Sequence, residues 1–462
     1  MNPLEQEKQF DETLQKTNKM GTAPMLPLIV SMSLPAVFSM LVQALYNVVD
    51  SIFVGQYDPV NALAAVSLAF PVQALMISVA VGTGVGLNSL ISRRLGEGRK
   101  DLASNAADHG ILLGLCSWAV FALLGIFFTR PFYQMFSDNA ALIEMATSYT
   151  QVVTIFSFGF LVEVNLEKAL QATGNMIYPM FFMLTGAITN IVLDPIFIFG
   201  LFGVPRMGVT GAAIATVIGQ ICSMLVALYV VFFKKHTIDF SLKGFRPHWR
   251  TVKEIYRVGV PSIIMQSIGS VMAATINMIL IQFNEAAVSV FGVYFKLQSF
   301  VFMPVFGLTH GVMPIMGYSY GSRNKKRLME ALRIGTIIAA CIMALGTILF
   351  WAFTPQLLQI FNASAELLEI GIPALRIISL CFIPAAVGIL FSTLFQALGM
   401  GIRSLIMSVM RQLVVLLPCA WWLARYGVNY VWMSFPIAEA VSLVVCIGLF
   451  VQLYRAHIRD ME

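Results

Sequence analysis

The sequence predicts an all-α polytopic membrane protein, with twelve transmembrane helices in two six-helix bundles related by pseudo-twofold symmetry. Apolar residues (AVILMFWYC) make up 58% of the 462 residues and charged residues only 11%, whereas about a quarter of an average soluble domain is charged. The apolar runs continue over about 20 residues or more, the length of a membrane-spanning helix, and do not alternate as the strands of an outer-membrane barrel do. The pattern of runs and loops also repeats once along the chain.

Twelve apolar runs lie between clusters of charged or turn-forming residues, and each is predicted to be one span. The spans are expected near 25–54, 62–92, 103–129, 141–170, 175–200, 209–233, 254–283, 287–318, 329–353, 366–397, 402–424 and 429–454. Residues 1–24 are predicted to be a cytoplasmic tail, without the apolar core of a cleavable signal peptide. Residues 234–253 form the longest polar stretch and are predicted to link a bundle at 25–233 to a bundle at 254–462.

The basic residues determine the expected orientation. Most of the 29 Lys and Arg residues lie on the tail, on the loops after even-numbered spans, or beyond the last span, whereas Arg130, Arg206 and Arg425 lie on the opposite loops. The positive-inside rule then predicts that both termini are cytoplasmic, in the inner (plasma) membrane. The net charge of +6 follows from this topology, so no nucleic-acid partner is implied. Membrane lipids and a small amphiphilic solute are the expected partners of a monomeric protein.

Short motifs show that the second half of the chain repeats the first. Ser33-Leu34-Pro35 recurs as Gly259-Val260-Pro261, and Gln171-Ala172-Thr173-Gly174 recurs as Gln396-Ala397-Leu398-Gly399. Each half has an even number of spans, so the two bundles share one orientation and are related by an axis along the membrane normal. Two such bundles suit alternating access around a central cleft, which favours a secondary transporter over a channel.

Two acidic residues of the first bundle are expected inside the membrane. Asp50 lies near the end of span 1 and Asp194 near the end of span 5, at a similar depth in the outer half. A charge at the bilayer centre costs about 2.5–3.5 kcal/mol, so each acid is expected to have a functional or structural role. Gln43, Tyr46 and Asn47 fall at helical spacing with Asp50 and form one polar stripe on span 1.

Span 5 brings further oxygen atoms to this depth. Asn190 lies one helical turn before Asp194, and Pro195 has no N–H, so the carbonyl of Ile191 loses its helical partner. Two carboxylates, an amide oxygen and a free carbonyl suit Na⁺, with Asp50, Asn190 and Asp194 as its ligands. Alternatively, two neighbouring carboxylates in a low dielectric favour a bound proton. A purely structural alternative is that Asp194 hydrogen-bonds to Asn190 or caps the kink.

Several motifs together carry a resemblance to a known family. They are Tyr46-Asn47-Val48-Val49-Asp50-Ser51-Ile52-Phe53-Val54-Gly55, Arg94-Leu95-Gly96-Glu97-Gly98, Asn190-Ile191-Val192-Leu193-Asp194-Pro195, Gly211-Ala212-Ala213-Ile214-Ala215-Thr216 and the paired Gln-Ala-x-Gly turns. Over nearly its whole length the chain resembles the multidrug and toxic compound extrusion (MATE) family of cation-coupled exporters. The resemblance implies an antiporter without a cofactor, which exports drugs or metabolites in exchange for Na⁺ or H⁺.

The resemblance also implies roles for single residues. It assigns the coupling site to Asp50, Asn190 and Asp194, and it adds Thr216 to that set. It further implies that span 1 bends at Pro35 during the transport cycle, for which a static kink is the alternative. The second half has no acidic counterparts, since the repeat aligns Thr275 with Asp50 and Cys419 with Asp194. Cation coupling is therefore predicted in the first bundle.

Further charged residues fall within the predicted spans. Glu167 and Lys168 lie near the inner end of span 4 and are interpreted as interfacial. Glu163 is interpreted either as a buried partner or as a gate or second proton site. Lys296 and Arg376 have no acid within their own spans, so they either face the cleft or hydrogen-bond to nearby carbonyls and glutamines. Arg411 and Glu439 lie mid-span on neighbouring helices, which predicts a structural ion pair.

Together these observations predict an exporter of amphiphilic, cationic organic solutes, driven by Na⁺ or H⁺ through coupling at Asp50 and Asp194 and by rocking of the two bundles. No Walker motif, HExxH motif or Ser/His/Asp grouping is present in the sequence, so no enzyme is expected. A flippase for a lipid-linked precursor is the alternative, with Lys296, Arg376 and Arg411 as possible contacts for a pyrophosphate. A receptor or scaffold is disfavoured by the acids deep in the membrane.

Overall fold

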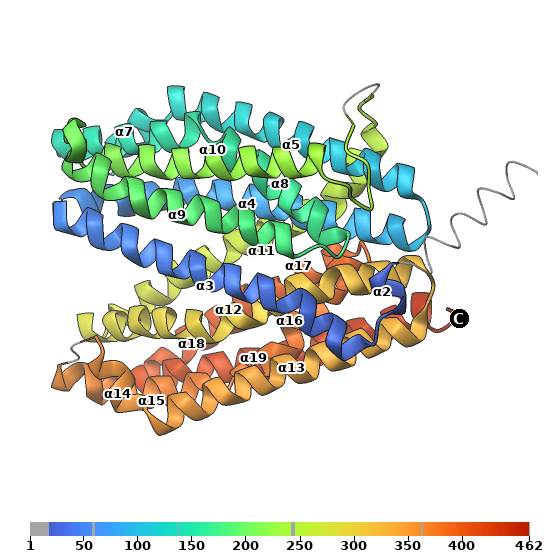
Figure 1. The fold of residues 1–462 in the computed structure, drawn as a ribbon. Helices are drawn as coiled ribbons and strands as arrows, with labels where there is room; N and C mark the ends of the chain where they lie inside the picture. Colours follow the sequence, from blue (N-terminus) through green and yellow to red (C-terminus); the bar gives the residue numbers. More distant parts are fainter. Residues whose placement is uncertain (1–17, 58–60, 137, 242–244, 362–363, 462) are drawn as a thin grey trace, which may run out of the picture. The chain divides into compact units, whose positions relative to one another are not determined.

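The computed structural model describes residues 18–57, 61–136, 138–241, 245–361 and 364–461, and the regular secondary structure within these ranges is entirely helical. Most of the predicted tail and residues 242–244 of the predicted linker lie outside the described residues. Figure 1 shows the helices in chain order from blue to red. The all-α prediction is confirmed.

The helices of the first half follow the predicted spans closely. They are α2 (Lys19–Thr22), α3 (Met25–Tyr57), α4 (Asn61–Gly96), α5 (Lys100–Phe127), α6 (Thr129–Gln134), α7 (Ala140–Ile155), α8 (Phe158–Ala172), α9 (Ile177–Phe199), the 3₁₀ helix η1 (Leu201–Gly203) and α10 (Val209–Phe233).

The second half repeats this order. Its helices are α11 (Trp249–Leu280), α12 (Glu285–Gly321), α13 (Lys325–Ala352), α14 (Thr354–Gln359), α15 (Ala365–Ser379), α16 (Phe382–Ala397), α17 (Gly401–Val409), η2 (Met410–Leu416), α18 (Leu417–Leu423), η3 (Ala424–Tyr426), α19 (Val428–Leu453) and η4 (Tyr454–Ile458). The elements η2 and η4 are π-helices, and η3 is a 3₁₀ helix.

Ten spans within the described residues are long and apolar enough to cross a membrane. Two further pairs, α7 with α8 and α15 with α16, pass the same test together but bend by 46° and 47° at their breaks. Counting each bent pair as one span gives twelve, as the sequence predicts. The sequence analysis did not predict the two breaks, nor the π-helix in the eleventh span.

Several helices start at a residue that caps their first turn. The side-chain oxygens of Asn139, Asn284, Asn324 and Ser364 accept hydrogen bonds from backbone N–H groups at the starts of α7, α12, α13 and α15. These N–H groups have no partner inside their own helix, so the caps fix where the helices begin.

The chain forms two compact units, each with its own core. The N-terminal unit comprises Phe38–Leu95 and Arg99–Ile263. In this unit α10 packs against α7, α8 and α9, and α5 packs against α7 and α8. Its α4 packs closely on α11 and α8 at two glycines. A Cβ on Gly86 would clash with the Ile255 carbonyl oxygen, and a Cβ on Gly84 would lie 2.6 Å from Lys168 Cγ.

The C-terminal unit comprises Ile264–Glu462, Gly96–Gly98 and the described residues through Val37. Here α13 packs against α12 and α16, and α19 packs against α15, α16 and α18. The division between the units therefore falls inside α3, two residues after Pro35, and inside α11, two residues after Pro261. Division at the linker 234–253 stays a prediction.

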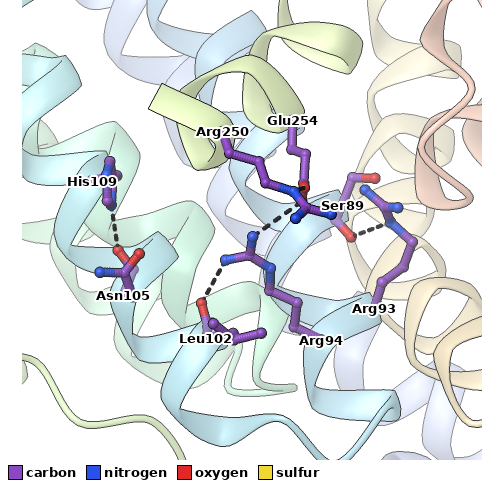
Figure 2. Close-up of polar contacts among 8 residues, drawn as sticks. All are labelled: Ser89, Arg93, Arg94, Leu102, Asn105, His109, Arg250 and Glu254. Carbon is purple, nitrogen blue, oxygen red and sulfur yellow. Dashed lines mark hydrogen bonds and ion pairs between the residues drawn. The ribbon is translucent and has the colours of Figure 1, made fainter. Parts of the chain in front are cut away.

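Arg94 ties three helices together at the end of the N-terminal unit where α4 ends (Figure 2). Its guanidinium donates to the Leu102 carbonyl at 2.7 Å and to Glu254 Oε2 at 3.0 Å. Arg250 pairs with the second oxygen of Glu254 at 3.4 Å. On α5, His109 Nδ1 lies 2.7 Å from the Asn105 carbonyl oxygen. We call this end of the unit the basic end.

Candidate functional site

Asp194 is completely buried on α9, inside the N-terminal unit. Its Oδ1 accepts a hydrogen bond from Asn190 Nδ2 at 3.3 Å, and the same amide nitrogen donates to Thr216 Oγ1 on α10 at 3.1 Å. The predicted trio Asn190, Asp194 and Thr216 therefore forms one connected group. Asp194 Oδ2 and Asn190 Oδ1 are buried and have no hydrogen-bond partner among the described residues.

Asp50 on α3 completes this group. Its carboxyl group is in hydrogen-bond contact with that of Asp194, and its Oδ1 is buried without a partner within the described chain. A hydrogen bond between two carboxyl groups needs a proton on one of them, because two carboxylates can only accept. The pair can therefore hold a positive charge between its oxygens.

Two tyrosines interact electrostatically with the acidic pair. Tyr46, four residues before Asp50 on α3, interacts electrostatically with both acids. Tyr149 on α7 does the same and accepts a hydrogen bond from Gln73 Nε2 at 3.0 Å. The sequence analysis missed Tyr149 and Gln73, since neither carries a charge that would mark it within an apolar span.

The rest of the predicted stripe on α3 is not drawn into the group. Gln43 and Asn47 are exposed, and the Asn47 carbonyl accepts a hydrogen bond from Ser51. Pro35 is half-buried inside α3, which continues through it as a helix. Its predicted role in bending remains a prediction.

Glu163 lies on α8 in a second buried polar cluster of the N-terminal unit. Lys168 Nζ donates to Glu167 Oε1 at 3.1 Å and to Gln171 Oε1 at 3.0 Å. Glu163 interacts electrostatically with both Glu167 and Lys168, and it hydrogen-bonds with Ser223 of α10. Glu167 and Lys168, which the sequence would place at the interface, are 7% and 4% exposed.

The charged residues of the C-terminal unit have local partners. Arg411 Nη1 donates to Glu439 Oε1 at 3.1 Å, which confirms the predicted ion pair. Arg376 Nε donates to Thr354 Oγ1 at 3.3 Å, and Lys296 Nζ lies 5.7 Å from the centre of the Phe361 ring. Arg376 therefore bonds to a hydroxyl group, whereas the sequence analysis expected carbonyls or glutamines as its partners. The predicted cleft role of both residues stays a prediction.

Comparisons with known proteins identify the family. A family model described as MatE matches residues 35–196 and again 261–422, so both halves carry the repeat. The chain is 25% identical over 441 residues to the "Multidrug export protein MepA" of Staphylococcus aureus, covering 94% of this chain and 95% of that protein. It is also 25% identical to the "FAD transporter" of Shewanella oneidensis, with 92% and 94% covered.

A solved structure agrees with the fold over nearly the whole chain. It is described as the outward-facing conformation of a multidrug resistance MATE family transporter of the MOP superfamily. The TM-score is 0.89, with 30% sequence identity, and 97% of this chain and 98% of that chain are covered. The chain therefore belongs to the MatE family of multidrug and toxic compound extrusion proteins, which are membrane transporters and not enzymes.

Proposed function

We propose that this protein exports amphiphilic organic solutes across the plasma membrane in exchange for a monovalent cation that binds at Asp50 and Asp194. The observation that carries the proposal is the contact between the half-buried Asp50 on α3 and the completely buried Asp194 on α9. Buried acids are costly in a membrane protein and mark ion pathways. The relative described as a multidrug export protein and the resemblance to cation-coupled exporters support the same activity.

Binding of a cation would change the charge of the site and so drive the exchange. A proton or Na⁺ on the pair removes the attraction for the cationic group of a solute, so cation and solute compete for the same state. One charge that moves inward through 100 mV supplies about 2.3 kcal/mol. This free energy supports roughly a 50-fold solute gradient.

Two features of the site bear on the nature of the cation. The contact between the carboxyl groups favours a proton, because one proton satisfies it. The free oxygens Asp50 Oδ1, Asp194 Oδ2 and Asn190 Oδ1 also suit Na⁺, as oxygen atoms are the ligands of hard cations. We propose the proton, with Na⁺ as the second candidate.

Transport into proteoliposomes tests this function. Uptake of a fluorescent organic cation is measured with a pH gradient alone and with a Na⁺ gradient alone, for the wild type, Asp50→Asn and Asp194→Asn. Glu144→Gln on α7 is the control, because this glutamate is exposed. We expect the pH gradient to drive uptake by the wild type and the control and not by the two Asn variants.

The same assay identifies the outcomes that contradict the proposal. Uptake driven only by Na⁺ would replace the proton with Na⁺ at the same residues. Uptake by both Asn variants at the wild-type rate would remove the coupling site from Asp50 and Asp194. A flippase would instead move a fluorescent lipid-linked pyrophosphate, for which the ion-paired Arg411 is not free.

A further inference from the structure

A stripe of polar side chains on α10 runs away from the acidic pair. Thr216, Gln220 and Ser223 follow one another at spacings of four and three residues, so they lie on one face of the helix. Thr216 accepts the hydrogen bond from Asn190, and Ser223 Oγ donates to the Phe182 carbonyl oxygen at 2.7 Å. Both partners are on α9, so the stripe follows α9 for about 10 Å.

The stripe falls between two separate apolar cores of the N-terminal unit. On α10, Val209 and Ala213 belong to one cluster, and Met224 and Ala227 belong to the other. On α9, Phe182 and Ile198 are divided between the same two clusters, with Asn190 and Asp194 between them in sequence. On both helices, the polar side chains therefore separate the two apolar clusters.

Glu163 lies at the far end of this stripe. It is 8% exposed and hydrogen-bonds with Ser223. Ser223 Oγ donates to the Phe182 carbonyl oxygen, and the same hydroxyl group interacts with the Glu163 carboxyl group. A buried carboxyl group at the end of a chain of polar side chains is typical of a proton relay in a membrane protein.

The surroundings of Glu163 suit a proton and not a metal ion. The charged groups that interact with it in the described chain are Glu167 and Lys168, both on its own helix. Lys168 and Gln171 hydrogen-bond to Glu167, so Glu163 shares the charge of Lys168 with a second carboxyl group. Its partner on α10 is one hydroxyl group, whereas hard metal ions need several oxygen ligands.

One buried acceptor on the stripe lacks a partner. Gln220 Oε1, between Thr216 and Ser223, makes no hydrogen bond within the described residues. Such an atom needs a donor, and a bound water is the usual one in a polar interior site. A water at Gln220 would continue the hydrogen bonds between the Thr216 and Ser223 ends of the stripe.

We propose that Glu163 is a second proton-binding site, which receives the coupling proton from Asp194 along Thr216, Gln220 and Ser223 and releases it at the basic end. This inference rests on the proposed function with H⁺ as the cation. In each transfer an O–H bond of Asp194 breaks and one forms on Glu163, through bridging water, and a water at the basic end finally takes the proton. From Glu163 to the end of α8 is about 14 Å, past Glu167 and Gln171.

Transport kinetics and infrared spectroscopy of the full chain test the route. Glu163→Gln keeps the shape of the side chain but cannot exchange a proton. We expect its pH-driven exchange to be at least about tenfold slower than the wild type and no longer to respond to the pH on the basic-end side. Its affinity for a fluorescent organic cation in detergent should stay within about twofold, because Asp50 and Asp194 remain intact.

Three variants separate a proton site from a merely structural residue. Glu163→Asp should restore part of the rate and the pH response. Ser223→Ala should slow exchange less than Glu163→Gln, since the acid remains. Asn165→Ala is the matched control, because Asn165 is equally buried on α8 but lies against Gly114 of α5, and it should keep the pH response.

Infrared spectra provide a readout that does not depend on transport. The carboxylic-acid band of a protonated Glu163 should be missing in Glu163→Gln and present in Asp194→Asn and Asn165→Ala. A wild-type pH response or an unchanged band in Glu163→Gln would overturn the route, while an inactive Asp194→Asn leaves the proposed function standing. If Asp194→Asn transports like the wild type, the proposed function fails, and the infrared band still decides whether Glu163 binds a proton.

Discussion

The two units carry their buried charges in different ways. In the C-terminal unit, Arg411 and Glu439 neutralise each other at 3.1 Å. In the N-terminal unit, Asp50 and Asp194 face each other and form no ion pair with a described basic residue, while Glu163 shares Lys168 with Glu167. A paired charge stabilises a bundle, whereas an acid without a counter-ion is costly there and is retained for a cation.

The same two regions share their backbone design. Both contain a span that breaks near its middle, at 46° between α7 and α8 and at 47° between α15 and α16. At each break a serine donates a hydrogen bond to the carbonyl three residues earlier, from Ser157 to Thr154 and from Ser379 to Arg376. Such side-chain bonds compete with the helical ones and bend helices. The repeat thus kept its geometry while its charges diverged.

The largest effect is expected from moving the acid between the halves. Asp194→Asn should reduce pH-driven uptake to the rate of empty vesicles. Cys419→Asp, at the matching position of the second half, should not restore uptake in the double variant, because Thr275 replaces the partner Asp50 there. Restored uptake in the double variant would show that the two halves are interchangeable.

A smaller difference in stability is expected between two glycines, one from each unit. Gly86→Ala places a methyl group against the Ile255 backbone, which cannot move as a side chain does, whereas a Cβ on Gly388 meets no atom within 4 Å. We expect Gly86→Ala to lower the free energy of unfolding by about 1–3 kcal/mol. Gly388→Ala should be neutral or stabilise α16 by up to about 1 kcal/mol. Thermal unfolding in detergent measures both, and equal shifts would contradict this difference.

The ion pair of the C-terminal unit tests the difference between the two units in how their buried charges are neutralised. Arg411→Met leaves Glu439 unpaired and should destabilise the protein by about 2 kcal/mol, less than a fully buried pair because the Arg411 side chain is 30% exposed. The double variant Arg411→Met/Glu439→Gln should regain most of this loss and keep pH-driven uptake. If the double variant loses pH dependence while it remains folded, coupling is not confined to the N-terminal unit.

The smallest effect is expected at two arginines that hold helix ends. Arg94 binds the Leu102 carbonyl and Glu254, and Arg327 binds the carbonyls of Met20 and Ala23. Lysine cannot reproduce such a fork of donors. Arg94→Lys and Arg327→Lys should each cost about 1 kcal/mol. Only the Arg94 effect should shrink in high salt, because Glu254 is charged and 36% exposed.

Most of the frame could be predicted from the sequence. The sequence predicts the twelve spans from their apolar runs. It also singles out Asp50 and Asp194 as acids within the membrane and predicts the pairing of Arg411 with Glu439, because charged residues stand out within apolar runs. Tyr149, Gln220 and Ser223 could not be found in this way, because uncharged polar residues are common in transmembrane helices. Their contacts depend on how neighbouring helices are rotated, and one residue turns a helix by about 100°.

Hydropathy, charge asymmetry and repetition are summed along the chain. The amino-acid order alone therefore determined the helical class, the number of spans and which acids lie within spans. It did not determine which of these acids contact one another. Tertiary structure decided that Asn190 bridges Asp194 to Thr216, that Lys168 is buried against Gly84, and that Glu163 reaches Ser223. Each of these contacts joins separate helices, and only close packing fixes the depth and rotation at which such helices meet.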